Sequence, residues 1–197
     1  MSVKILTAIL AMALSVCATF AAGCAKAADS ADTEADNRPG KAQIDTTFAE
    51  QEELDMNIID IEGNDRFVRI TREALNFIAE KSPEHYRMVT TYMKKIKHTN
   101  RNSGMLVKEN PPTFIVNDVD LEAPLCWYAS DIVHDAWHSK LYHDYLAGHS
   151  YVPDSVYMGY EAEMKCLQVQ KEFLIVADVD QRYLDWIDKT PETRWWE

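Results

Sequence analysis

Two histidines, His134 and His138, stand four residues apart in a segment whose apolar residues recur at helical spacing. On a helix this spacing places both imidazoles on one face, a single turn apart, where they can bind one metal ion. Asp135 directly follows the first histidine, where its carboxylate could reach a water on that metal. Glu161 and Glu163 open the next expected helix and could supply the third protein ligand of a catalytic zinc site. The pattern predicts a metal site, and the alternative is one histidine in the core and one in solvent.

The sequence HDAWH from His134, with EMKC from Glu163, resembles the gluzincin class of zinc metallopeptidases. Members of that class carry H-E-x-x-H on one helix and a glutamate on the next, which in one branch opens E-x-x-A; Cys166 replaces the alanine here. The resemblance covers roughly residues 105–176. It implies that the two histidines and Glu163 bind Zn²⁺, that Asp135 is the catalytic carboxylate, and that a peptide or protein substrate lies along a strand edge.

Asp135 departs from this pattern, because the class has glutamate there. The shorter side chain can move the carboxylate by about 1 Å, and such a displacement can lower a rate about a hundredfold. The leading hypothesis is a zinc-dependent, peptidase-like metallohydrolase. The alternatives are a non-catalytic envelope lipoprotein that keeps a zincin-like scaffold and binds a metal or partner, and a helical domain without a metal.

Three further residues are candidates for supporting roles. Asp131 could orient a metal-binding imidazole, although a carboxylate on a helix surface is a common alternative. His143 could contact the site or donate to an oxyanion, and the alternative is a solvated histidine. Glu161 is the fallback third ligand, because helical phase alone does not distinguish it from Glu163.

Two of the four cysteines, Cys126 and Cys166, belong to the expected folded part. In an oxidising compartment such a pair predicts one disulfide, which would join the helix with two ligands to the helix with the third. Two alternatives stay open: a pair of buried thiols, and Cys166 as a metal ligand in competition with oxidation.

The first 23 residues predict an export signal, because a basic start precedes an uncharged apolar run and small residues. Cys24 then matches a bacterial lipobox, which implies a lipid anchor in the membrane of the cell envelope. Ala25–Ala27 offers a rival cleavage site that would release a secreted or periplasmic protein. Residues 24–40 are polar and predict a disordered tether.

The remaining residues, 41–197, have the length of one zincin-like domain of mostly helical α+β class, with a small hairpin or sheet packed on the central metal-binding helix. Apolar spacing predicts helices over about 67–81, 82–97, 125–147, 157–177 and 181–187, and short strands at 105–107 and 113–116. The formal net charge of −12 argues against nucleic acid as a partner.

Overall fold

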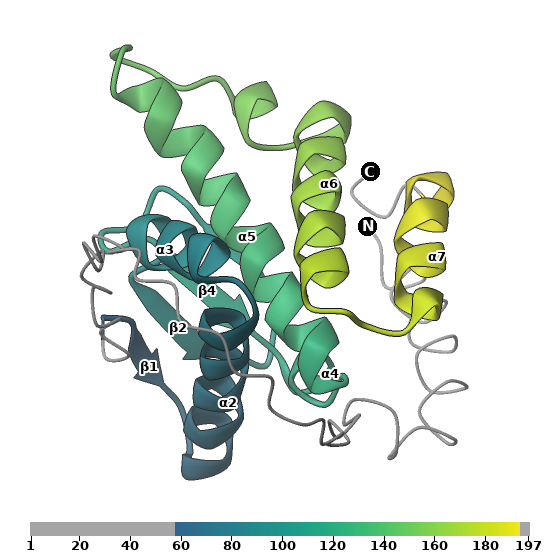
Figure 1. Ribbon diagram of the computed structural model, residues 1–197. Coiled ribbons are helices and arrows are strands. Elements are labelled where there is room, and N and C mark those ends of the chain that lie inside the picture. The colour runs from purple at the N-terminus through teal and green to yellow at the C-terminus, as the bar shows by residue number, and fades with distance from the viewer. Residues whose placement is uncertain (1–57, 194–197) are drawn as a thin grey trace, which may run out of the picture.

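The computed structural model describes residues 58–193, which form an α+β structure with helices over one face of a small mixed sheet (Figure 1). This confirms the expected mostly helical α+β class. The elements are β1 (Asp60–Glu62), α2 (Asp65–Lys81), α3 (Pro83–Tyr92), β2 (Lys95–His98), β3 (Gly104–Leu106), β4 (Thr113–Val116), α4 (Asp118–Leu121), α5 (Leu125–Leu146), η1 (Asp154–Val156), α6 (Tyr160–Val176), α7 (Gln181–Lys189) and η2 (Thr190–Thr193).

The expected signal sequence, the tether and the lipidation residue Cys24 lie outside the described residues. Within residues 58–193 no helix combines the length and apolar character that crossing a membrane requires.

The sheet has the strand order β1-β2-β4-β3. Strands β1, β2 and β4 run parallel, and β3 runs antiparallel to β4 at one edge. The register aligns one apolar side chain per strand across the sheet: Ile61, Ile96, Phe114 and Met105. All four belong to or pack on the main hydrophobic core, so this face of the sheet meets the helices. The expected hairpin of β3 and β4 is confirmed.

The opposite face of β1 and β2 is charged. Lys95 Nζ lies 3.2 Å from Asp60 and 2.5 Å from Glu62, whose other oxygen lies 2.6 Å from Lys97 Nζ.

The expected helix over 82–97 is too long, because α3 ends at Tyr92 and β2 begins at Lys95. The sequence KIKH alternates between a buried apolar face and a charged one, as a half-buried strand does.

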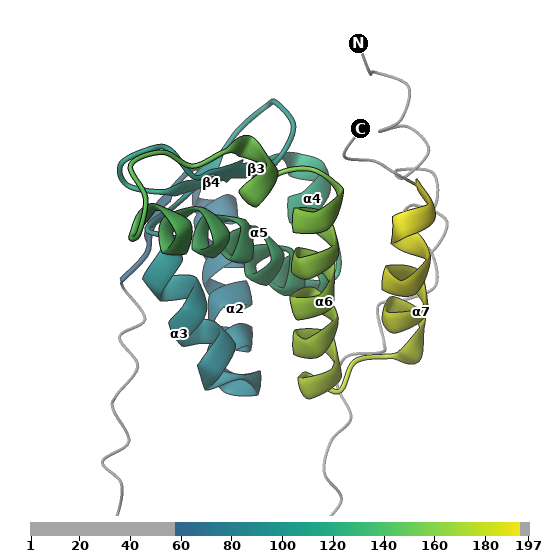
Figure 2. The same ribbon diagram turned by 90° about the horizontal axis from the view of Figure 1, so that it is seen from above.

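Helix α5 is the centre of the fold. It packs against α2, α3 and α6, and also contacts β3 and β4 (Figure 1). Buried residues lie around much of its circumference, as expected for a helix enclosed by its neighbours. Figure 2 shows α6 between α5 and α7, with α7 on the outside. His134 and His138 therefore lie on a helix that its neighbours enclose.

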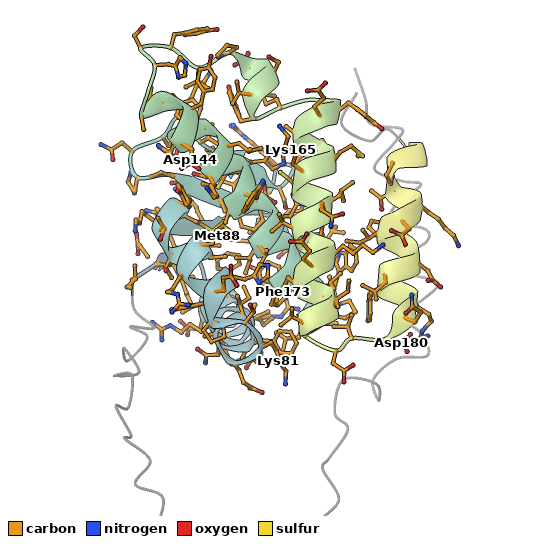
Figure 3. The ribbon with its side chains drawn as sticks, turned by 45° about the horizontal axis from the view of Figure 1, so that its top comes forward. Lys81, Met88, Asp144, Lys165, Phe173 and Asp180 are labelled. Carbon is orange, nitrogen blue, oxygen red and sulfur yellow. The ribbon has the colours of Figure 1, made fainter. Side chains whose placement is uncertain are left out.

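Helix α6 starts at a fixed point because of Gly159. This residue has a φ of 80°, a region that glycine enters readily and other residues rarely do. Its carbonyl then accepts a hydrogen bond from the Glu163 amide at 3.0 Å, in the first turn of the helix. At the other end of the helix lies the buried Phe173, which Figure 3 labels. Its ring packs against Phe77 of α2 and His85 of α3.

Candidate metal centre

Helices α5 and α6 run antiparallel and face each other with two stripes of polar side chains. On α5 the stripe is Ser130, His134 and His138, at intervals of four residues. On α6 it is Glu163, Cys166 and Gln170, at intervals of three and four residues. Gln170 meets Ser130 at 3.0 Å, while Glu163 meets the histidines at the other end. Both stripes follow the helical repeat, so each helix presents its polar groups on a single face.

The two imidazoles converge at their Nε2 atoms. His134 Nε2 and His138 Nε2 are 3.1 Å apart, and the rings are tilted by 57° to each other. The carboxylate of Glu163 faces both rings, with one oxygen 3.3 Å from His134 Nε2 and the other 3.5 Å from His138 Nε2. All three side chains are buried. The structure thus brings together the three residues that the sequence predicts as ligands.

The far nitrogen of each ring has a hydrogen-bond acceptor. His134 Nδ1 donates to Gln170 Oε1 at 3.0 Å, and His138 Nδ1 donates to the Tyr157 carbonyl at 2.8 Å. The amide nitrogen of Gln170 donates to Ser130 Oγ and to Asp131 Oδ1, which leaves its oxygen to face His134. In a neutral imidazole a proton on Nδ1 leaves a lone pair on Nε2. Both rings are therefore oriented as metal ligands commonly are.

The side chains of Glu163 and His138 shift each other's pKa values. Burial opposes charge on Glu163, but the adjacent imidazoles of His134 and His138 lower its pKa to about 2. Burial likewise disfavours the charged form of His138, yet its contacts with Cys166 and Glu163 raise its pKa well above the usual value. Two Nε2 lone pairs 3.1 Å apart repel unless a proton or a metal ion lies between them.

Cys166 completes the group of donors. Its Sγ and the ligand nitrogens of His134 and His138 all lie within 4.8 Å of one another, and these three residues could hold a metal ion. Around a tetrahedral ion with bonds of about 2.0–2.3 Å, neighbouring ligand atoms are about 3.3–3.8 Å apart. The distance of 3.1 Å between the two imidazole Nε2 atoms is close to this range, and each Nε2 lies 3.3–3.5 Å from a different oxygen of Glu163.

Asp135 lies beside the centre, half-buried on α5. Burial raises the pKa of its carboxyl to about 6, while the neighbouring His134 and His138 act in the opposite direction. A carboxylate with a pKa near neutrality can accept and return a proton at neutral pH.

The other candidate residues are placed differently. Glu161 is exposed to solvent on α6, whereas Glu163, two residues later, is buried against the imidazoles. Asp131 Oδ1 accepts a hydrogen bond from the side-chain amide of Gln170 at 2.8 Å. Asp131 is thus linked to His134 through Gln170. His143 packs its ring edge-on against Tyr142, with ring centroids 5.1 Å apart, and is outside the group of converging donors.

The expected Cys126–Cys166 disulfide is a wrong prediction, because both cysteines are buried thiols without a bond between them. The register of the helices gives the reason. Cys166 lies one turn from Gln170, which is level with Ser130, and Cys126 lies one turn beyond Ser130 in the opposite direction. About eight residues of helix, or ~12 Å, therefore separate the two cysteines along the axis. A disulfide requires Cα atoms within about 7 Å.

Sequence reasoning missed Gln170 and Tyr157 as hydrogen-bond partners of His134 and His138. Gln170 could have been found, because it follows Glu163 by seven residues and so shares its helical face. The role of the Tyr157 carbonyl could not be found in this way, because every residue has a backbone carbonyl. Its position depends on packing of Tyr157 with Val107 and Val152, and on the 2.6 Å hydrogen bond from its hydroxyl to Asp154.

The contact between Gln170 and His134 gives a first testable prediction. Replacing Gln170 with leucine removes the acceptor of the Nδ1 proton, and loss of such a partner typically lowers metal affinity about 10- to 100-fold. Gln168→Leu is the matched control, because Gln168 is exposed on the same helix and bonds to Glu172. Competition for zinc against a chelator of known affinity measures both variants. Equal affinities would show that Gln170 does not orient the ring.

Comparisons of this chain with protein-family models, with curated protein sequences and with solved structures found no match.

Proposed function

We propose that this protein is a zinc-dependent hydrolase that acts on peptide or protein substrates, with a centre like that of the gluzincins. The observation that carries the proposal is the convergence of two correctly oriented imidazole Nε2 atoms and one buried carboxylate. In this proposal His134, His138 and Glu163 are the zinc ligands. Two imidazoles and a carboxylate are a ligand set typical of catalytic zinc.

Zinc bound there would polarise a substrate carbonyl and make water nucleophilic near neutral pH. Asp135 accepts the proton of the attacking water and passes it to the leaving amine. Its pKa of about 6 supports this role, because the carboxylate is ionised at pH 7 and still basic enough to be protonated transiently. Glu163 stays ionised throughout, which its low pKa favours.

The edge strand β3 supports a peptide as the substrate. It is the last strand of the described sheet and contacts α5, the helix that carries both histidines. An extended peptide can add to such an edge through main-chain hydrogen bonds, which recognise the backbone and not a particular side chain. A peptide held there would lie beside a strand that packs on α5.

The test of the base role uses two substitutions at one position. Asp135→Asn keeps the shape of the side chain but removes its basicity, and we expect kcat/KM to fall at least about 100-fold. Asp135→Glu keeps the carboxylate and is expected to retain most of the activity. The assay is cleavage of an internally quenched peptide library by untagged, zinc-loaded protein. Turnover that survives the asparagine substitution would exclude Asp135 as the base.

Zinc content should be measured on the same samples, because it separates loss of the base role from the absence of catalysis in a protein that binds zinc. An Asp135→Asn protein with one zinc and no activity supports the base role. Wild-type protein with one zinc and no activity supports the second candidate function, a non-catalytic scaffold that binds a metal or partner. The shorter acid at position 135 favours that second candidate, since the class it resembles has glutamate there.

The proposed location is the cell envelope, reached through the export signal. Cys24 would anchor the protein to the membrane through a lipid, and cleavage after Ala27 would release it. In both cases the substrates are peptides or proteins outside the cytoplasm.

A further inference from the structure

The thiol of Cys166 has a place in the metal centre that the proposed hydrolase does not require. Cys166 follows Glu163 by three residues on α6 and is fully buried. Its sulfur lies within 4.8 Å of the ligand nitrogens of both histidines. The centre therefore contains four protein donors: two imidazole nitrogens, a carboxylate and a sulfur.

The number of protein ligands, four or three, decides whether bound zinc is closed to water or open to it. A tetrahedral ion with four protein ligands is closed, as in structural sites, whereas a catalytic ion keeps one position open for water or substrate. The two imidazole Nε2 atoms are 3.1 Å apart, and Glu163 faces both of them with its two oxygens. The remaining fourth position can be taken by water or by Cys166, but not by both.

Cys166 is a suitable ligand for that position by its distance and its chemistry. A sulfur ligand is about 3.6 Å from neighbouring ligand nitrogens. The separation of up to 4.8 Å is about 1 Å more, which a small rotation of the side chain can close. Thiolate is a strong zinc ligand, and a coordinating thiol loses its proton on binding.

Cys126 provides an internal comparison. It is as fully buried as Cys166, but it lies at the far end of α5, about 12 Å along the helix axis from Cys166. Cys166 instead contacts His138 and lies near Glu163 and Asp135, whose charges surround its sulfur.

We infer that Cys166 is a fourth, exchangeable ligand that closes the metal centre when its sulfur binds and opens it when its sulfur leaves. This inference rests on the proposed metal site and deepens it. The resting protein holds the metal with four ligands and excludes water from it. Substrate or water gains access only in the fraction of molecules in which Cys166 has turned away.

Cobalt is the probe for this inference, because Co²⁺ occupies zinc sites and its absorption spectrum reports thiolate binding. Wild-type protein loaded with one Co²⁺ is expected to show a sulfur-to-cobalt charge-transfer band in the near ultraviolet. Cys166→Ala is expected to bind one Co²⁺ without that band. The Cys126→Ala control is expected to retain the band.

Access to the open position is measured on the same proteins. Azide added to Cys166→Ala is expected to change the cobalt d–d spectrum at concentrations at least 10-fold lower than those that change the wild-type spectrum. The same substitution is expected to increase peptide turnover by zinc-loaded protein. Cys166→Ser serves as a second variant, because it keeps nearly the same volume if alanine impairs folding.

The outcomes distinguish this inference from the proposed function. A wild-type cobalt protein without the charge-transfer band, or a Cys166 variant that keeps it, would overturn the role of Cys166. If the band is present but neither wild-type nor Cys166→Ala protein cleaves peptides, the fourth ligand stands and the hydrolase proposal fails. Protein that binds neither cobalt nor zinc would overturn both.

Discussion

His138→Ala is expected to abolish stoichiometric zinc binding, whereas His143→Ala is expected to leave one zinc per chain. His138 supplies one of the two converging Nε2 atoms, and its removal also leaves Glu163 buried without one of its two imidazole contacts. His143 lies on the same helix, but its ring packs against Tyr142. Elemental analysis of protein purified without a histidine tag measures the metal.

Thermal unfolding provides an independent measure of the same effect. A ligand at 100 times its Kd stabilises the folded state by about 2.7 kcal/mol. For a chain of this size that corresponds to an increase in Tm of about 5–11 °C. Zinc is expected to raise the Tm of wild-type and His143→Ala protein by this amount, and to have little effect on His138→Ala. A zinc-dependent shift that persists in His138→Ala would contradict the proposed site.

Phe173→Ala is expected to reduce the free energy of unfolding by about 3–5 kcal/mol, because it removes a fully buried aromatic ring. The ring packs against Phe77 of α2 and His85 of α3, so its loss weakens the attachment of α6 to both helices. At about 2–4 °C per kcal/mol, the Tm is expected to fall by about 6–20 °C. Differential scanning calorimetry of the metal-free protein measures the change.

Ile175→Ala is the matched control for this substitution. Ile175 lies two residues away on the same helix and is 56% exposed, so its truncation is expected to change stability by less than about 0.5 kcal/mol. If both variants lose the same stability, the contacts of Phe173 are not what hold α6 in place. Zinc should restore part of the stability of Phe173→Ala, because α6 also carries Glu163 of the metal centre.

The sequence predicted the part of the site that depends on local helical repeats. The interval between His134 and His138 places both rings on one face of any helix, and the structure adds only their distance. The choice between Glu161 and Glu163 could not be made in the same way. It depends on the rotation of α6 relative to α5, which is set by the turn at Gly159 and by packing around Phe173.

The failures of sequence reasoning concern longer-range geometry. The disulfide prediction assumed that two cysteines on adjacent helices meet, but the register of α5 against α6 separates Cys126 from Cys166. Strand β2 was missed because KIKH carries a single apolar residue, Ile96, which happens to continue the helical spacing of α3. The parallel partners of β2 are residues 60–62 and 113–116, far apart in sequence, so no local pattern reveals the pairing.

The charged face of the sheet also affects how copies of the chain meet one another. Strand β1 is the edge of the described sheet farthest from β3, and it carries Asp60 and Glu62 on one side. If two copies paired antiparallel along this edge, Asp60 of one would oppose Glu62 of the other at a strand spacing of about 4.8 Å. Like charges directly opposite each other destabilise such a pair. The carboxylates that bind Lys95 and Lys97 therefore also discourage aggregation through this edge.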